Sequence, residues 1–121
     1  MLFRSKQEER YFEILGGRFV EHGPVERFQV QPTTAQDEIF DVPTFSVTDE
    51  LYRHEYDPGN RIHYFTIVDG EREPVVWTRR HGQGRVCYCA LGHTADTVRH
   101  YNVQRILQRG LAWACGQRMQ P

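Results

Sequence analysis

Three apolar segments that follow one another closely, at residues 62–68, 74–79 and 85–91, most strongly constrain how this chain folds. Each is rich in β-branched and aromatic residues, and short turn sequences at 69–73 and 81–84 separate them. This spacing predicts three adjacent strands joined by hairpins. The third segment contains the sequence VCYCAL, which is apolar on both faces. We therefore expect a strand within a sheet that helices cover on both sides.

The clearest helix is predicted near the end of the chain. Apolar or small residues recur there at helical spacing, at positions 103, 106, 107, 110, 111 and 114. Asn102 is expected to cap this helix, and Gly116 to follow its last turn. A shorter helix is predicted over residues 6–15. The remaining predicted elements are short strands at 28–30 and from 45 onward, with a loop at 32–44.

A sheet covered on both faces needs two helical layers, but this sequence predicts only one long helix and one short one. We therefore expect the chain to be the C-terminal part of a larger α/β domain, with a homo-oligomer as another way of covering the bare face. Residues 1–5 are expected to be a non-native leader, residues 6–117 the domain part and residues 118–121 a tail.

Charge and composition argue against several classes of function. The chain has 15 Lys and Arg against 16 Asp and Glu, a net charge of -1, which predicts neither nucleic-acid binding nor attraction to a membrane. No apolar run reaches the roughly 20 residues that cross a bilayer. The three cysteines are an odd number and no export signal is recognised, so we expect a reducing compartment, the cytoplasm.

His93 is the first candidate functional residue. It directly follows Gly92 after the third apolar segment, so we expect it at the carboxyl end of a central strand, where open α/β sheets bind ligands. An imidazole in that place suits general acid/base chemistry or metal ligation. The alternative is a histidine that only caps a loop, and its position alone favours neither role.

Asp49, Glu50 and Tyr52 form a second candidate group. Two carboxylates beside a phenol could bind sugar hydroxyls, hold a histidine or ligate a cation. On an extended strand Glu50 and Tyr52 point one way and Asp49 the other. An acidic pair that is merely solvated is the alternative. His22 is a weaker candidate, because it lies in a loop-like sequence with Gly23 and Pro24.

Other reactive residue types are expected to be structural. The cysteines are predicted to be buried thiols, because their spacing is neither C-x-x-C nor G-x-C-x-G. The sequence HGQG at 81–84 is explained by a hairpin turn, since it precedes a strand instead of opening a helix. Structural or surface roles are also expected for three histidines without the spacing of a metal pair: His54, His63 and His100.

Several short motifs, taken in order, form a familiar series: GGRF at 16–19 with His22, DELY at 49–52, PVVW at 74–77, GRVCY at 84–88 with LGH at 91–93, and GLAWA at 110–114. The series resembles the C-terminal half of the trehalose-utilisation family, the ThuA-like domains. This resemblance implies a partial three-layer α/β fold of the class I glutamine amidotransferase-like or flavodoxin-like type, with a mixed sheet and one long C-terminal helix. It also implies a role in carbohydrate metabolism, on disaccharides or oxidised sugar derivatives.

The same resemblance implies a set of site residues. Glu50 and His93 are the expected catalytic residues, with His93 acting as an acid/base group or a ligand. Substrate contacts are expected from four further residues: Asp49, Tyr52, His22 and Thr94. Two ligands are too few to predict a metal ion, and neither the sequence nor the resemblance indicates a cofactor. The expected partner is a small-molecule sugar.

Three departures from the family pattern limit what the resemblance implies. The family's N-terminal half, with its opening β-α-β units, is not recognised in this sequence. The usual acidic-His-Pro stretch is replaced by Gln36-Asp37-Glu38, which puts a role for that loop in doubt. No elbow cysteine is present, so glutamine amidotransferase chemistry is not expected. The rival hypothesis is a non-catalytic sugar-binding or assembly module, in which Trp77, Tyr52 and the carboxylates only hold a glycan.

Overall fold

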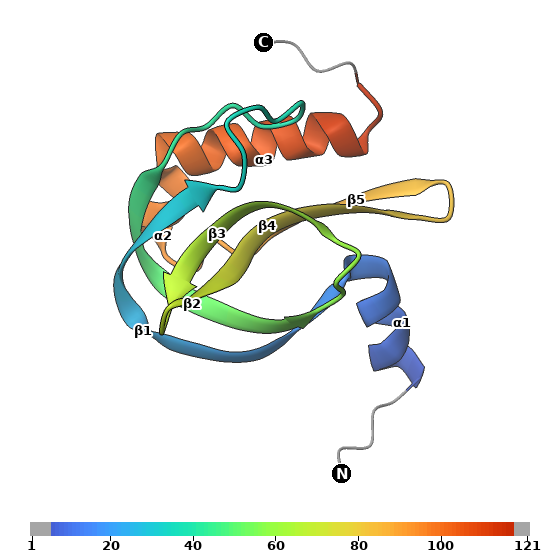
Figure 1. The fold of residues 1–121 in the computed structure, drawn as a ribbon, viewed down its shortest axis with the longest axis horizontal. Coiled ribbons are helices and arrows are strands. Elements are labelled where there is room, and N and C mark those ends of the chain that lie inside the picture. The colour runs from blue at the N-terminus through green and yellow to red at the C-terminus, as the bar shows by residue number, and fades with distance from the viewer. Residues whose placement is uncertain (1–5, 118–121) are drawn as a thin grey trace.

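The computed structural model describes residues 6–117 and folds them into an α/β arrangement (Figure 1). The predicted leader at 1–5 and tail at 118–121 lie outside the described residues. None of the helices in the described part is long and apolar enough to cross a membrane. In chain order the elements are α1 (Lys6–Leu15), β1 (Gly17–Pro32), β2 (Phe45–Tyr56), β3 (Arg61–Val68), β4 (Glu71–His81), β5 (Gly84–Cys89), α2 (Ala95–Arg99) and α3 (Tyr101–Ala114).

The strands form a five-stranded sheet in the order β2-β1-β3-β4-β5. Every strand pair in this sheet is antiparallel, so the prediction of a mixed sheet is wrong for residues 6–117. Short connections explain two of these pairs, β3–β4 and β4–β5, since strands joined by tight turns run antiparallel. The predicted hairpins between β3 and β4 and between β4 and β5 are confirmed. Gly70 and Gly82 occupy their turns with φ of 81° and 58°, which glycine adopts without strain.

The sheet is strongly curled, and β1 causes most of the curl. This strand pairs with β2 along most of its length but reaches β3 only through its last two residues, Gln31 and Pro32. Its register with β2 shifts twice, between residues 19 and 21 and between residues 22 and 25. Such bulges bend a strand and increase its twist. Figure 1 shows the β1–β2 pair sweeping around the β3–β4 hairpin.

The strand β5 lies at the edge of the sheet among the described residues, not at its centre as predicted. Most of its side chains are only half-buried, and α3 packs against it. The chain leaves the strand after Cys89, and the next two residues, Ala90 and Leu91, are buried outside it. An apolar run predicts burial but not strand order, because helix packing and an adjoining loop also bury an edge strand.

Only part of the predicted apolar stripe of α3 faces the sheet. Val103 and Ile106 are fully buried, whereas Leu107 is 42% exposed and Leu111 is 67% exposed. An apolar stripe is expected to pack on the sheet as a whole, which is confirmed for Ile106 and wrong for Leu107 and Leu111. The stripe spans more than 100° of the helix surface, and the sheet and loop contact only the side that carries Val103 and Ile106.

The ends and the middle of α3 show how it is held. His100, not the predicted Asn102, is the N-cap, and its side chain accepts a hydrogen bond from the Asn102 N–H. Gly116 follows the last turn with φ of 76°, as predicted. Gly110 allows close approach to β5, since a Cβ atom there would lie 2.6 Å from Sγ of Cys87. A side chain at position 110 would therefore push the helix away from the sheet.

The loop between β1 and β2 closes the core from one side. Its apolar residues Ile39, Phe40 and Val42 are buried in the same cluster as the sheet and α3. Arg105 forms a bidentate ion pair with Asp41, with nitrogen–oxygen distances of 2.6 and 3.1 Å, and so ties this loop to α3. The loop thus replaces part of a helical layer with an extended segment.

Candidate functional site

Four aromatic side chains from β1, β2 and the segment after β5 form the candidate site. We call this group the ring cluster; it consists of Phe19, His22, Tyr52 and His93. The β1–β2 register pairs His22 with Tyr52, and their ring centroids lie 5.5 Å apart. Phe19 packs against Tyr52 at 4.7 Å. The cluster is accessible, since Phe19 is 49% exposed and both histidines are exposed.

His93 stacks directly on Tyr52. The two ring centroids are 3.5 Å apart and the planes differ by only 5°. Nε2 of His93 lies 2.6 Å from the Ala90 carbonyl oxygen. A carbonyl can only accept, so Nε2 carries the proton and donates it. In the neutral imidazole, Nδ1 therefore keeps its lone pair and can accept a proton or bind a cation.

Asp49 and Gly92 hold His93 in this position. The Asp49 carboxylate accepts the backbone N–H of Gly92 at 3.0 Å and that of His93 at 3.1 Å. Gly92 adopts φ of 106°, a left-handed conformation that favours glycine. Asp49 itself is completely buried. It therefore positions the loop that carries His93, over a sequence separation of 44 residues.

Glu50 adds a carboxylate beside the ring cluster. Its Oε2 lies 3.5 Å from Nδ1 of His22, and the Glu50 side chain is 30% exposed. Nδ1 of His22 also donates to the Gly23 carbonyl at 2.9 Å. In the neutral imidazole this leaves Nε2 of His22 as an acceptor. Along β2, Asp49 is buried while Glu50 and Tyr52 are partly exposed, which matches the predicted alternation.

Thr94 secures the start of α2. Its hydroxyl accepts the Thr97 N–H at 3.2 Å as the N-cap, and it donates to the Thr48 carbonyl at 3.2 Å. These bonds join the segment after His93 to β2. The predicted site residues therefore fall into two groups: Tyr52, His22, Glu50 and His93 line one surface, whereas Asp49 and Thr94 support it from behind.

Trp77 lies elsewhere and is not available to a glycan. Its side chain is completely buried, stacks on Tyr88 at 4.3 Å, and donates its indole N–H to the Leu15 carbonyl at 2.8 Å. His54 contacts both rings, and burial lowers the pKa of His54. The suggestion that Trp77 holds a glycan is therefore wrong, because the curl of the sheet encloses its ring.

A buried hydrogen-bond chain was missed in the sequence. Asp37 Oδ2 lies 2.5 Å from Nδ1 of His63, and Nε2 of His63 lies 2.6 Å from the Thr78 hydroxyl. Burial acts to raise the pKa of Asp37, but the hydrogen bonds from His63 and from the backbone of Ile39 and Phe40 outweigh it and lower the pKa. Asp37 thus has a defined role in the loop, although the sequence alone left that loop in doubt.

No three His, Cys, Asp or Glu side chains within residues 6–117 are grouped in a way that could hold a metal ion. Cys87 and Cys89 are free thiols on β5 that partly pack into the core, as expected, whereas Cys115 is exposed. Burial raises the pKa of Cys87 to about 12 and that of Cys89 to about 11. Neither buried thiol is a nucleophile at neutral pH.

The chain resembles known proteins over most of its length. The family model ThuA, described as trehalose utilisation, matches residues 3–114. A ThuA-like protein from Parabacteroides merdae ATCC 43184 has a similar crystal structure, with 26% sequence identity and a TM-score of 0.70. The similarity covers 88% of this chain and 43% of that one, so the chain spans less than half the length of its structural relative. No curated protein matches the chain. With the family model matching most of its length, the chain belongs to the ThuA, or trehalose utilisation, family.

Proposed function

We propose that the ring cluster is a carbohydrate site and that His93 acts there as an acid/base group on a disaccharide or an oxidised sugar derivative. The observation that carries this proposal is the parallel stacking of His93 on Tyr52, with ring centroids 3.5 Å apart. Flat rings offer an apolar surface to a sugar ring, and polar groups around them fix its orientation. The ThuA family supports carbohydrate as the class of ligand.

The chemistry follows from the free nitrogen atoms. In the neutral imidazole of His93, Nε2 donates to the Ala90 carbonyl and leaves Nδ1 with a free lone pair. Nδ1 can then take a proton from a sugar hydroxyl or return one to a leaving oxygen. Glu50, 3.5 Å from His22, supplies a negative charge near a developing positive charge on the sugar or on His22. Asp49 and Thr94 serve as positioning residues in this proposal.

The rival candidate is a sugar-binding module without catalysis. The accessible ring cluster could bind a sugar equally well in an enzyme and in a binding module, because binding needs only the ring surface and the polar groups around it. The two candidates differ in turnover alone. The geometry at His93 favours the enzyme, because an ordered imidazole with one free nitrogen suits proton transfer more than a simple contact would require.

The distinguishing experiment follows the sugar itself by NMR. The chain is incubated with trehalose, and separately with a keto derivative of a disaccharide, and products are recorded over time. We expect His93→Ala to lower the rate by about 10² to 10⁴. His81→Ala, at the exposed histidine that ends β4, is the matched control and should leave the rate unchanged. Saturable binding with no product from either sugar would favour the binding module.

We also propose that this chain forms the C-terminal half of a three-layer domain of the glutamine amidotransferase-like type, working in a reducing compartment. Support for the domain comes from the structural relative, of which this chain matches 43%. Support for the compartment comes from the three free cysteines.

A further inference from the structure

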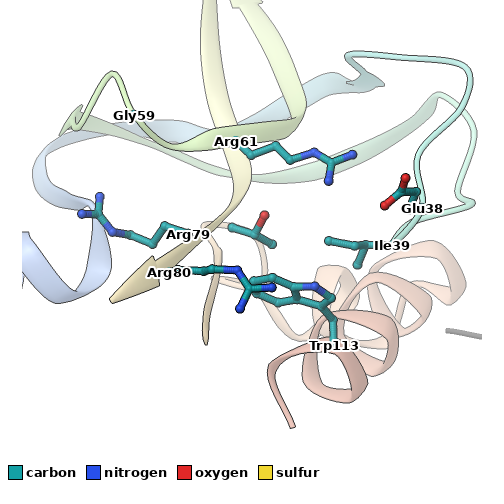
Figure 2. A pocket seen from close by; sticks show the side chains of 8 residues that line it. Glu38, Ile39, Gly59, Arg61, Arg79, Arg80 and Trp113 are labelled. Carbon is teal, nitrogen blue, oxygen red and sulfur yellow. The ribbon is translucent and has the colours of Figure 1, made fainter. Parts of the chain in front are cut away.

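A second concave site lies away from the ring cluster and shares no residue with it. This pocket has a volume of about 330 Å³ and lies between β3, β4, the β1–β2 loop and the end of α3. Its lining is rich in arginine and consists of Glu38, Ile39, Gly59, Arg61, Thr78, Arg79, Arg80 and Trp113. We call it the arginine pocket (Figure 2). Arg79 is paired with Asp57, which leaves Arg61 and Arg80 against Glu38 and a net positive character, although the whole chain is close to neutral.

The strand register explains why the arginines gather here. Arg61 on β3 pairs with Thr78 on β4, and Arg80 lies two residues further along β4, on the same face as Thr78. Arg80 in turn pairs directly with Arg85 on β5. Like charges opposite one another across strands destabilise a sheet unless something compensates them. Arg85 is compensated by its contacts with Trp113, so the Arg80–Arg85 pair is tolerated and places a further arginine beside the pocket.

The arginines differ in how far they are already satisfied. Arg79 binds Asn60 at 2.7 Å and Asp57 at 3.2 Å, and Arg85 donates to the Trp113 carbonyl at 3.0 Å. Arg80 makes no hydrogen bond or ion pair recorded within residues 6–117. The nearest carboxylate to Arg61 is 4.0 Å away, on Asp37, which is already bound to His63. Arg61 and Arg80 thus retain hydrogen-bond donors for a ligand.

The positions of the side chains suit one small ligand. Figure 2 shows Arg61 and Arg80 extending toward the part of the pocket where Ile39 and Trp113 lie, whereas Arg79 points the other way. Guanidinium groups bind phosphate and carboxylate through paired hydrogen bonds. The indole of Trp113 and the side chain of Ile39 offer an apolar wall for the rest of the molecule. A pocket of this volume is at the lower end of the range for small-molecule sites.

We propose that the arginine pocket binds the phosphate or carboxylate group of a small-molecule ligand, with Arg61 and Arg80 as its anion-binding residues and Trp113 against the body of the ligand. The proposal does not depend on the ring cluster being a sugar site. Thr78 also lines the pocket and is buried, and its hydroxyl is hydrogen-bonded to His63, which Asp37 holds in turn. That chain fixes Thr78 while the two arginines take up the anion.

Trp113 provides a direct readout. The chain has two tryptophans, and Trp77 is completely buried, so a ligand in the pocket changes the fluorescence of Trp113. Inorganic phosphate, glucose 6-phosphate and gluconate are titrated at constant ionic strength, and the anion with the lowest dissociation constant identifies the class. We expect saturable binding, and a dissociation constant raised by about tenfold or more in Arg61→Gln and in Arg80→Gln, as for loss of a charge-assisted hydrogen bond.

Two controls make the result specific. Arg99→Gln removes an exposed arginine from α2, outside the pocket, and should leave binding unchanged. Tyr52→Ala alters the ring cluster and should also leave anion binding unchanged, which separates this proposal from the proposed function. Circular dichroism confirms folding of each variant, and ³¹P line broadening of phosphate gives a second measure of binding. The proposal would be overturned if none of the three anions bound saturably, or if Arg99→Gln weakened anion binding as much as the pocket variants do.

Discussion

The three cysteines of this chain differ in reactivity because their surroundings differ. Cys87 and Cys89 are partly packed into the core beside α3, and burial raises the pKa of both thiols, to about 12 and about 11. Cys115 lies at the exposed end of α3. Sequence spacing argued against a catalytic pair, but it could not show that Cys115 is exposed, because exposure depends on where α3 ends relative to the sheet.

At neutral pH, a thiol reagent such as dithionitrobenzoate should therefore modify Cys115 rapidly and the other two cysteines only after unfolding. The expected stoichiometry is one fast equivalent in the native protein and three in denaturant, since the chain has three cysteines. Cys115→Ser should remove the fast phase and serves as the control. A fast phase that persists in this variant would show that the reagent reaches Cys87 or Cys89 on β5 in the native protein.

Asp37 should make the fold sensitive to acid. Its pKa is lowered by hydrogen bonds from His63 and the loop backbone, which outweigh the effect of burial. A carboxyl group whose folded pKa lies below its unfolded value of about 3.9 contributes full stability above that value and loses it as pH falls through the folded pKa. Asp37→Asn should therefore lower the unfolding midpoint at pH 7 and flatten its decline below about pH 4.

The measurement is the thermal midpoint between pH 7 and pH 2.5, with Asp69→Asn, at an exposed turn residue, as the control. The pKa of Asp41 is also lowered, mainly by the hydrogen bond from Arg105. Asp37→Asn should therefore remove only part of the acid dependence of the thermal midpoint. If the curve for Asp37→Asn runs parallel to that of the unchanged chain, the hydrogen bond between Asp37 and His63 is not coupled to folding.

Among the elements, α3 shows both the strength and the limit of sequence patterns. Its spacing predicts a helix and its apolar stripe, but the stripe is wider than the surface that receives it. Leu107 and Leu111 lie at the outer edge of the stripe and remain exposed, whereas Val103 and Ile106 are buried. A periodic pattern shows which side of the helix faces the core, and packing decides which side chains on that side are covered.

Adjacent residues on α3 therefore offer a matched test. Ile106→Ala should cost about 2 to 5 kcal/mol of unfolding free energy, the range for buried large-to-small changes. Leu107→Ala, at a side chain that is 42% exposed, should cost clearly less, about 1 kcal/mol. Denaturant unfolding of both variants gives the comparison. Equal losses would mean that something covers Leu107 in solution, and a negligible loss for Ile106→Ala would mean that α3 is not docked.

The long strand β1 could not be predicted from its sequence. Residues 17–27 contain glycine, proline and charged residues without alternation, so the sequence indicated a loop there and only a short strand at 28–30. The structure extends the strand over Gly17–Pro32, with most side chains exposed on both faces. A strand that is exposed on both sides lacks the alternating pattern, because its stability comes from backbone pairing with β2 and not from burial.

At the scale of the whole molecule, the sequence predicted the α/β class and the ThuA family, but it did not predict the order of the strands. The candidate residues do meet, but not for the predicted reason, since β5 is an edge strand in an antiparallel sheet. Two long-range features bring them together: pairing of His22 with Tyr52, and capture of the His93 loop by Asp49. Contacts between residues 15 to 44 positions apart leave no local trace in one sequence. The Asp37–His63–Thr78 chain and the arginine pocket were missed for the same reason.

The central claim, that the ring cluster binds carbohydrate, is tested most directly by calorimetric titration of trehalose into the chain and into Tyr52→Ala. Removal of the ring that touches Phe19, His22 and His93 should weaken binding by about tenfold or more, as expected when a stacking surface is lost. Tyr101→Ala, at a tyrosine that is 77% exposed on α3, is the control and should bind as the unchanged chain does. Saturable binding that is weakened in Tyr52→Ala alone is the predicted result, and binding of equal affinity in all three proteins would contradict the account.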